Sequence, residues 1–337
     1  MGHVISRYCK LEGQYRGNMK TLHVLFLAAL VVACGGDKGD PAVPELGMDY
    51  LDEMLDIMQD HALYKKTIDW PNMRSQVLNK ANTDGAKTIE DVYPAIEFAL
   101  SFLVETGSRY FATNSTVITA PRDECTGSSA TVDINDSNIG YVPVTRIEDA
   151  QAAQAAVDLQ AVIKNQDSEN IKGWIVDLRG NTGGNMMAML AGIGPLLGNG
   201  VTGYFINSDD TEFQVSYDDG TMLNSGATLN YVADFYTLIK PAQKIAVLID
   251  QRTASSGEGT AIAFMGRSNA RLFGSTTCGR AFGPTQFIMS DGALLSLIDA
   301  VMADRNKTKM SVGVYPDEAV SGDKEVVDKA IEWINEK

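Results

Sequence analysis

The chain has 337 residues, of which 45% are hydrophobic and 21% are charged, and its formal net charge is −15. This length and composition are enough for one large core or two smaller ones, and they argue against disorder beyond the N-terminal region. A strongly negative surface repels phosphate backbones, so the composition also argues against nucleic-acid binding.

The first 33 residues have the pattern of a secretory leader. Lys20 precedes an apolar run over residues 22–33 that is too short to span a bilayer permanently. Cys34 follows Val-Val-Ala, as in a bacterial lipobox, so we expect it to carry a lipid anchor. The alternative is an ordinary cleaved signal with an incidental cysteine. The sequence therefore predicts an exported lipoprotein, facing the periplasm or on the cell surface, with residues 34–45 as a tether.

Residues 46–112 are expected to form a small helical cap domain. Apolar residues recur at helical spacing from Met48 to Leu63 and again from Val92 to Leu103. Pro71 stands where a helix between these two would begin.

Residues 113–337 are expected to form an α/β core domain. Short apolar runs alternate with helical patterns, which predicts a twisted, mostly parallel sheet with covering helices. Hairpins are expected within 203–238 and at 287–295, where Ser-Asp-Gly supplies the turn. The strands are expected at 138–144, 173–178, 245–249 and 270–273, and the helices at 148–165, 186–197, 256–265 and 323–335.

The core contains two cysteines, Cys125 and Cys278. In an exported protein they can form a disulfide, and the alternative is two separate buried thiols. No group of histidine, cysteine and acidic residues has metal-ligand spacing, and no nucleotide-binding fingerprint is present, so the sequence predicts no metal and no cofactor.

Two segments are candidates for chemistry. Asp177-Leu-Arg-Gly-Asn-Thr-Gly-Gly184 follows a buried strand, and its glycines allow close approach to a ligand; the simpler reading is a tight turn with an Asp177–Arg179 ion pair. Ser255 lies between an apolar strand and a helix, an elbow that exposes a serine hydroxyl beside free N–H groups. Glu258 stands three residues later, as in a capping box, and has a second reading as an aid to catalysis.

Together the two segments resemble the tail-specific, or C-terminal processing, family of serine peptidases. The later motifs Gly274-Ser-Thr-Thr-Cys-Gly-Arg280, Ser290-Asp-Gly and Gly313-Val-Tyr-Pro-Asp also match that family. Only about 30 residues separate Ser108 from the strand at Asn138, too few for the ~90-residue PDZ module of many relatives. The resemblance therefore implies the PDZ-less branch, with a ClpP/crotonase-like core and a peptide or protein substrate.

The resemblance also implies a mechanism. Ser255 is the nucleophile, and N–H groups near Gly183, Gly184 and Ser256 form the oxyanion hole. The general base is not where the family has it. Arg280 stands at the position of the family's lysine and stays protonated. Gly107 stands at the position of its histidine.

Three other residues are candidates for the base. His61, in the first helix, is read as a structural histidine. Glu105 or Glu258 would need a pKa raised by burial. The sequence therefore predicts a serine-type peptidase with a diverged base. The alternatives are a pseudo-peptidase that binds peptides, and a hydrolase that uses the same serine on an activated ester.

Overall fold

The computed structural model describes residues 46–84, 86–105, 107–127, 134 and 136–336. By compactness the chain divides into residues 1–39 and 40–337, and the second unit is the subject here. The predicted leader, Cys34 and the tether lie outside the described residues.

The first part of this unit is helical, as the sequence predicts. It contains α2 (Leu46–His61), α3 (Trp70–Asp84) and α4 (Tyr93–Ser101), the last preceded by a 3-10 turn (Glu90–Val92). The apolar residues at helical spacing, Leu51, Met54, Leu55 and Met58 among them, are buried in one cluster. The methionines of α2 are therefore core residues.

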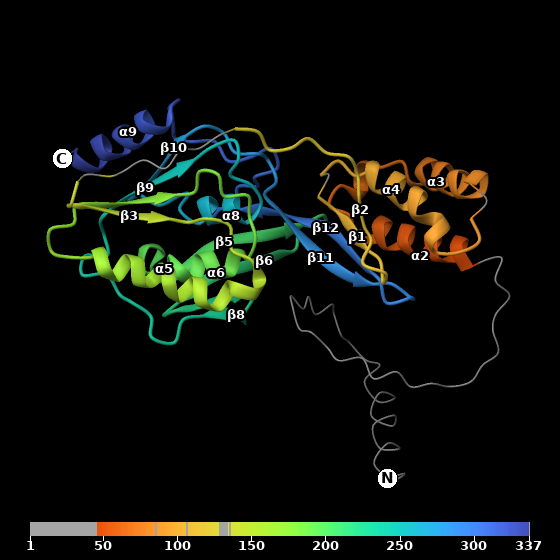
Figure 1. Cartoon of the computed structure of the whole chain (residues 1–337), viewed down its shortest axis with the longest axis horizontal. Coiled ribbons are helices and arrows are strands. Elements are labelled where there is room, and N and C mark those ends of the chain that lie inside the picture. Colours follow the sequence, from red (N-terminus) through yellow and green to blue (C-terminus); the bar gives the residue numbers. More distant parts are fainter. Residues whose placement is uncertain (1–45, 85, 106, 128–133, 135, 337) are drawn as a thin grey trace, which may run out of the picture. The chain divides into compact units, whose positions relative to one another are not determined.

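A five-stranded sheet, all parallel, forms the centre of the α/β region (Figure 1). Its order is β13-β10-β9-β4-β3. The four predicted strands are confirmed within a residue or two. The strands are β3 (Ile139–Pro143), β4 (Gly173–Asp177), β9 (Lys244–Ile249), β10 (Ala270–Gly274) and β13 (Glu318–Ala319).

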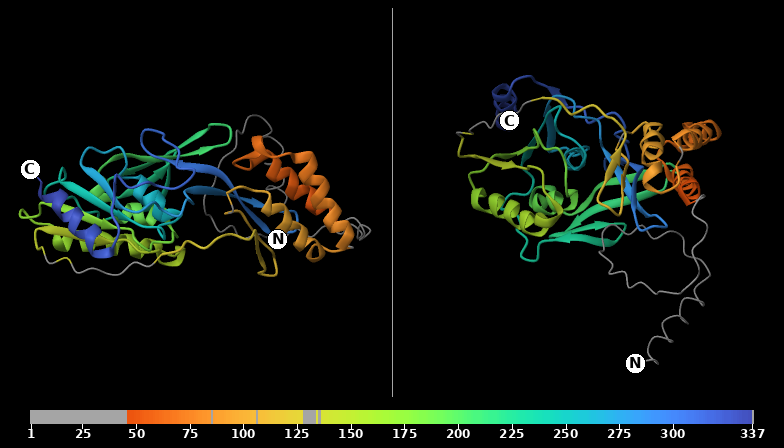
Figure 2. Two further views of the ribbon diagram at one scale, coloured as in Figure 1. Left: turned by 90° about the horizontal axis from the view of Figure 1, so that it is seen from above. Right: turned by 45° about the vertical axis from the view of Figure 1, so that its right-hand side comes forward.

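Helices cover both faces of this sheet (Figure 2). Trp174 and Val176 point to one face and pack in a cluster with residues of the helices that follow β3, β4 and β9. Ile175, between them, points to the other face and packs with the C-terminal helix. This alternation is the two-residue period of a strand. The helices are α5 (Ala152–Gln166), α6 (Met186–Gly192), α7 (Gly194–Leu197), α8 (Ser256–Ile262) and α9 (Asp323–Asn335).

The single helix expected over 186–197 is two helices. They meet at Ile193, and Pro195 lies in the first turn of α7. A proline cannot donate to the preceding turn and its ring crowds that turn, so the chain restarts its helix there.

A second, eight-stranded sheet joins the helical part to the α/β core. Its order is β2-β1-β12-β5-β6-β7-β8, with β11 also paired to β12, and every pairing is antiparallel. The predicted hairpins supply most of it. The strands are β1 (Arg109–Phe111), β2 (Val117–Thr119), β5 (Gly200–Asn207), β6 (Glu212–Asp218), β7 (Thr221–Asn224), β8 (Ala227–Tyr231), β11 (Phe282–Ile288) and β12 (Leu294–Ala303).

Strand β12 is the element shared by both parts. Leu295 and Leu297 pack with the helices α2 and α4, whereas Met302 packs in the core beneath α6 and α8. Strand β1, which lies in the segment assigned to the cap, pairs with β12. The helical part is therefore fixed to the core by a sheet.

Candidate active site

The two candidate segments meet at one edge of the parallel sheet. Strands β4 and β9 are parallel neighbours, so the loops that follow them leave the sheet side by side. The Ala254 N–H donates to the Asn181 carbonyl over 2.9 Å, and the Gly180 N–H donates to the Asp250 carboxylate over 3.0 Å. The glycine loop and the serine elbow, about 70 residues apart in sequence, are thus hydrogen-bonded to each other.

Asn181 organises the glycine loop, a role that the sequence analysis did not give it. Its side chain is buried, its amide nitrogen donates to the Val144 carbonyl over 2.8 Å, and its amide oxygen accepts the Gly183 N–H over 2.9 Å. That last bond occupies one of the N–H groups predicted for the oxyanion hole. As the structure stands, the Gly183 N–H points to Asn181 and is not available to an oxyanion.

Ser255 has an uncommon backbone conformation. It precedes α8 with φ 54° and ψ −120°, a region that non-glycine residues rarely occupy. Such a conformation costs about 1–3 kcal/mol and persists only where the surroundings enforce it. The side chain is half-buried and lies against Gly183, where a Cβ would stand 3.3 Å from the Ser255 Oγ. The elbow predicted from sequence is therefore formed.

The other two residues predicted for the oxyanion hole are in contact with each other. The Ser256 hydroxyl donates to the Gly184 carbonyl over 2.5 Å. Gly184 has φ +110°, and a Cβ there would lie 2.1 Å from the Ile147 carbonyl oxygen, so only glycine fits. Ser256 is the first residue of α8, where N–H groups have no intrahelical acceptor.

Glu258 is fully buried and accepts four hydrogen bonds. One oxygen accepts the Thr277 hydroxyl over 2.5 Å and the Gly279 N–H over 2.9 Å. The other accepts the N–H groups of Ser255 over 2.8 Å and Arg280 over 2.7 Å. Burial raises the pKa of Glu258, while these donors act in the opposite direction. Both oxygens are engaged, so Glu258 holds the elbow and the 277–280 loop together.

Cys125 and Cys278 form a disulfide, which decides between the two readings of the sequence. The bond joins the 277–280 loop to the segment that follows β2. The Arg280 guanidinium donates to the Asp123 backbone carbonyl in the same segment. Arg280 therefore contacts the backbone of that segment through a side chain that stays charged.

The loop before β1, which contains Gly107, holds a buried carboxyl group. Gly107 itself lies against the Ile298 side chain. The Ser108 hydroxyl donates to Glu105 Oε1 over 2.7 Å and accepts the Ile298 N–H over 2.9 Å. Glu105 Oε2 is buried and has no hydrogen-bond partner among the described residues. Burial raises the pKa of Glu105, which the Ser108 bond opposes.

His61 lies elsewhere. It is exposed at the end of α2, with its ring 4.7 Å from that of Phe287. Strand β11 begins at Phe282, next to the Arg280 loop, and Phe287 lies about 17 Å further along it. His61 therefore contacts the end of β11 that is distant from Arg280. The ring contact supports the structural reading of this histidine.

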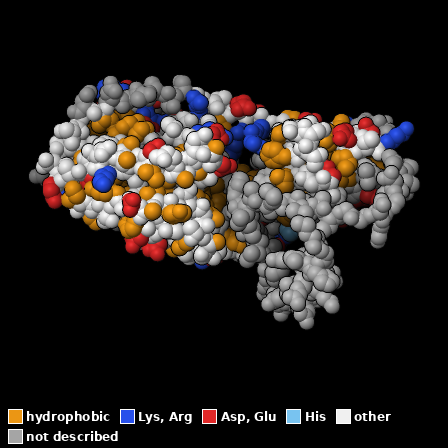
Figure 3. Space-filling model, turned by 60° about the horizontal axis from the view of Figure 1, so that its bottom comes forward, with side chains coloured by type: hydrophobic (Ala, Val, Ile, Leu, Met, Phe, Trp, Pro, Cys, Tyr) orange, Lys and Arg blue, Asp and Glu red, His pale blue; other side chains and the backbone are white. Residues whose placement is uncertain are grey.

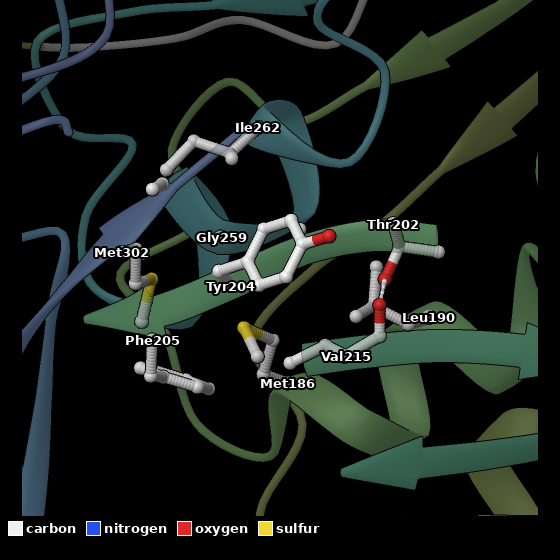
Figure 4. A pocket seen from close by; sticks show the side chains of 11 residues that line it. Met186, Leu190, Thr202, Tyr204, Phe205, Val215, Gly259, Ile262 and Met302 are labelled. Carbon is white, nitrogen blue, oxygen red and sulfur yellow. Dashed lines mark hydrogen bonds between the residues drawn. The ribbon is translucent and has the colours of Figure 1, made fainter. Parts of the chain in front are cut away.

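A small apolar pocket lies beside α8 (Figure 4). The side chains of Met186, Phe205, Ile262 and Met302 line it, and the Thr202 hydroxyl in its wall donates to a backbone carbonyl over 3.1 Å. Gly259, also in the wall, donates its N–H to the Ser255 carbonyl, so the pocket is one helical turn from the elbow. It offers apolar contact and no charged partner.

Asp177 and Arg179 form the ion pair that the simpler reading of their segment predicts. The Arg179 guanidinium donates to both Asp177 oxygens, over 2.9 and 2.6 Å, and also reaches Asp323 at the start of α9. Both side chains of the pair are buried. The pair fixes the start of the glycine loop to the C-terminal helix.

The described residues contain neither a metal-binding group nor a membrane-spanning helix. No group of three or more histidine, cysteine or acidic side chains in that part of the chain could hold a metal ion. No helix within it is long and apolar enough to cross a bilayer.

A strand–elbow–helix serine with a glycine loop beside it is the arrangement in which many hydrolases hold a nucleophile. Among such proteins, this chain belongs to peptidase family S41, whose model matches residues 138–320, more than half of the chain. The family predicted from sequence is therefore confirmed, as is the fold class.

Among curated proteins, the chain is 27% identical over 299 residues to the nisin-resistance protein of Lactococcus lactis subsp. lactis, covering 87% of this chain and 88% of that protein. It is 28% identical over 165 residues to the carboxy-terminal processing protease CtpA of Bacillus subtilis, of which it covers 31%.

Solved structures show the same fold. A lipoprotein from Streptococcus agalactiae matches with a TM-score of 0.64 at 21% identity, over 88% of this chain and 99% of that one. The photosystem II D1 C-terminal processing protease matches with a TM-score of 0.52 at 14% identity, over 82% of this chain and 92% of that one.

Proposed function

We propose that this protein is an exported serine-type peptidase with Ser255 as its nucleophile. The observation that carries the proposal is the Ser255 backbone, which is kept in a costly conformation while the buried Glu258 accepts its N–H over 2.8 Å. In this mechanism the Ser255 Oγ attacks a peptide carbonyl carbon and its proton passes to a base. The N–H groups of Gly184 and Ser256 bind the resulting oxyanion, and the peptide C–N bond then breaks with the leaving amine protonated.

The mechanism needs a group that accepts the Ser255 proton, and three ionisable side chains are candidates for it. Glu258 has both oxygens engaged by donors, and the Arg280 guanidinium cannot accept a proton. Glu105 is the remaining ionisable candidate near the family's histidine position, because burial raises its pKa and one of its oxygens has no partner in the described chain. Without a working base, an oxyanion hole and binding still supply roughly 10³–10⁴ over water in serine proteases.

The second candidate function is peptide binding without turnover. The observations that favour it are Gly107 and Arg280 at the two positions where family members carry a base. The same elbow and glycine loop would then hold a peptide chain rather than cleave it.

We further propose an exported, lipid-anchored location and peptide substrates from outside the cell. The relatives named a nisin-resistance protein and a lipoprotein support this, as does the disulfide, which is typical of oxidising compartments. A net charge of −15 would favour cationic peptides over anionic ones.

The deciding experiment is labelling of the purified protein with a fluorophosphonate probe, compared with Ser255→Ala. We expect labelling that disappears in the variant, since the probe reacts only with an activated serine. Ser256→Ala is the matched control, and it should still be labelled, although more slowly. Equal, background labelling of the folded protein and of Ser255→Ala would reject the peptidase and leave peptide binding.

A further inference from the structure

Arg109 has an unusual environment for a charged side chain. It lies on β1 and is half-buried, yet its guanidinium makes no hydrogen bond or ion pair with the part of the chain that the structure describes. A guanidinium has five donors and is always charged, so partial burial without a partner is unfavourable. An arginine held in this way is suited to binding an anion.

Two further arginines approach Arg109 from the disulfide-linked segment and its loop. Arg109 pairs with Thr119 across β1 and β2, and the chain continues from there to Arg122 and Asp123. Arg280 donates to the Asp123 carbonyl, which brings it to the same place. Arg122, like Arg109, has no side-chain hydrogen bond or ion pair within the described residues.

A fourth arginine, Arg146, is next in sequence to a residue that pairs with the glycine loop. Arg146 precedes Ile147, which forms a bridge with Gly184, the residue in contact with Ser256. Its guanidinium pairs with Glu148 over 2.5 and 3.2 Å, and both side chains are exposed. Arg109, Arg122, Arg146 and Arg280 are called the arginine cluster below. Two of its members are connected to the elbow: Arg280 through Glu258, and Arg146 through Ile147 and Gly184.

The charges of these side chains act on one another. Burial is the first cause of a lowered pKa for Arg109, and the charges of Arg122, Arg146 and Arg280 follow. Burial and Arg122 likewise lower the pKa of Arg280, against the opposing charges of Glu124, Glu258 and Asp123. On the face drawn in Figure 3, basic side chains gather most densely in one place near the middle. Such mutual repulsion within an acidic protein is relieved when an anion binds.

We propose that Arg109, Arg122 and Arg280 form a subsite that binds a carboxylate group of a peptide lying beside Ser255. A carboxylate fits the planar fork of a guanidinium, and two parallel bonds to it fix its orientation as well as its charge. The peptide itself rests on the function proposed above. The carboxylate belongs either to the C-terminus of the peptide or to an aspartate or glutamate side chain.

The test is thermal unfolding of the purified protein with small carboxylates at constant ionic strength. N-acetylalanine carries a free terminal carboxylate, N-acetylalaninamide carries none, and the α-amide of N-acetylaspartate carries only a side-chain carboxylate. A ligand at ten times its Kd favours the folded state about tenfold, which raises the Tm by about 2 °C in a protein of this size. We expect this rise with a carboxylate and not with the neutral amide.

The variants assign the effect to the cluster. Arg109→Gln and Arg280→Gln should each abolish the rise. Arg271→Gln should keep it, because Arg271 is a half-exposed arginine of β10 that pairs with Glu318 over 3.2 Å. A rise with N-acetylalanine alone identifies a C-terminal carboxylate, a rise with the aspartate derivative alone identifies a side chain, and equal rises mean that either is bound.

Three results would overturn the proposal. They are no difference between carboxylates and the neutral amide, a rise that persists in both cluster variants, and an equal rise with inorganic phosphate, which would indicate a general anion site. Because this experiment measures binding and not turnover, it can succeed when fluorophosphonate labelling fails. The two proposals can therefore be rejected separately.

Discussion

Two buried glutamates, Glu258 and Glu105, show how differently the same side chain is used in two regions of this molecule. Glu258, after the elbow, has four donors on its two oxygens. Glu105, before β1, has the Ser108 hydroxyl on one oxygen and no partner for the other among the described residues. Burial raises the pKa of both.

The difference lies in how well the surroundings of each carboxyl group compensate a negative charge. Four donors converge on Glu258 and compensate a carboxylate, so its charge organises the site. Glu105 has one oxygen without a partner among the described residues, so a negative charge there is poorly compensated and a protonated carboxyl is better suited to that place. The Ser255 elbow is therefore held by a carboxylate with four donors, while the loop before β1 holds a carboxyl group that favours its neutral form.

Replacement of Glu258 should give the largest effect. Glu258→Gln puts an NH₂ group against two of the four donors, and we expect a loss of about 4 kcal/mol in the free energy of unfolding, measured in urea. Glu332→Gln is the control, an exposed glutamate paired with Lys329 over 2.9 Å, and should change stability by less than about 0.5 kcal/mol. A loss as small as that of the control would show that Glu258 does not hold the 277–280 loop.

Removal of the disulfide tests the other connection to the same loop. Cys125→Ala with Cys278→Ala opens a link across 153 residues of sequence, and we expect a loss of about 3 kcal/mol. Reduction of the wild-type protein should give the same loss, and reduction should not affect the double variant. If the double variant unfolds at the wild-type urea concentration, the disulfide does not stabilise this region.

The smallest effect is expected at Glu105, and its dependence on pH carries the information. A raised folded-state pKa means that the stability from the neutral carboxyl is present below the unfolded-state pKa and is lost as pH rises through the folded-state value. Glu105→Gln stays neutral and can still accept from Ser108. Its stability relative to wild type should increase with pH, by about 1.4 kcal/mol for each unit by which the pKa is raised.

Urea unfolding of both proteins from pH 4 to pH 8 measures this difference. Parallel curves over the whole range would mean that folding does not raise the pKa of Glu105. The proposed contrast, in which Glu258 is a carboxylate and Glu105 favours its neutral form, would then be wrong. Glu105 would be no better suited than Glu258 to a change of protonation during catalysis.

Local sequence was enough for the elements around the site. Apolar periodicity predicted β4, β9 and α8, because a strand buried on both faces and a small-residue helix leave clear patterns over a few residues. The spacing of Ser255 and Glu258 predicted the elbow and the capping geometry. The two motifs together predicted the family. They lie side by side in the structure because the strands that precede them, β4 and β9, are adjacent and parallel.

Only the tertiary structure decided what each group does. Three of the donors to Glu258 come from residues 277–280. The Asn181 side chain accepts the Gly183 N–H, and Cys125 forms a disulfide with Cys278. These contacts depend on how loops that are distant in sequence pack, and no local pattern records that. The same holds for Arg109, whose place beside the other arginines follows from the pairing of β1 with β2. The sequence alone determined the strand, the serine elbow and the helix at Ser255, and the packing around that elbow determined which charged groups and N–H groups have no partner within the described chain.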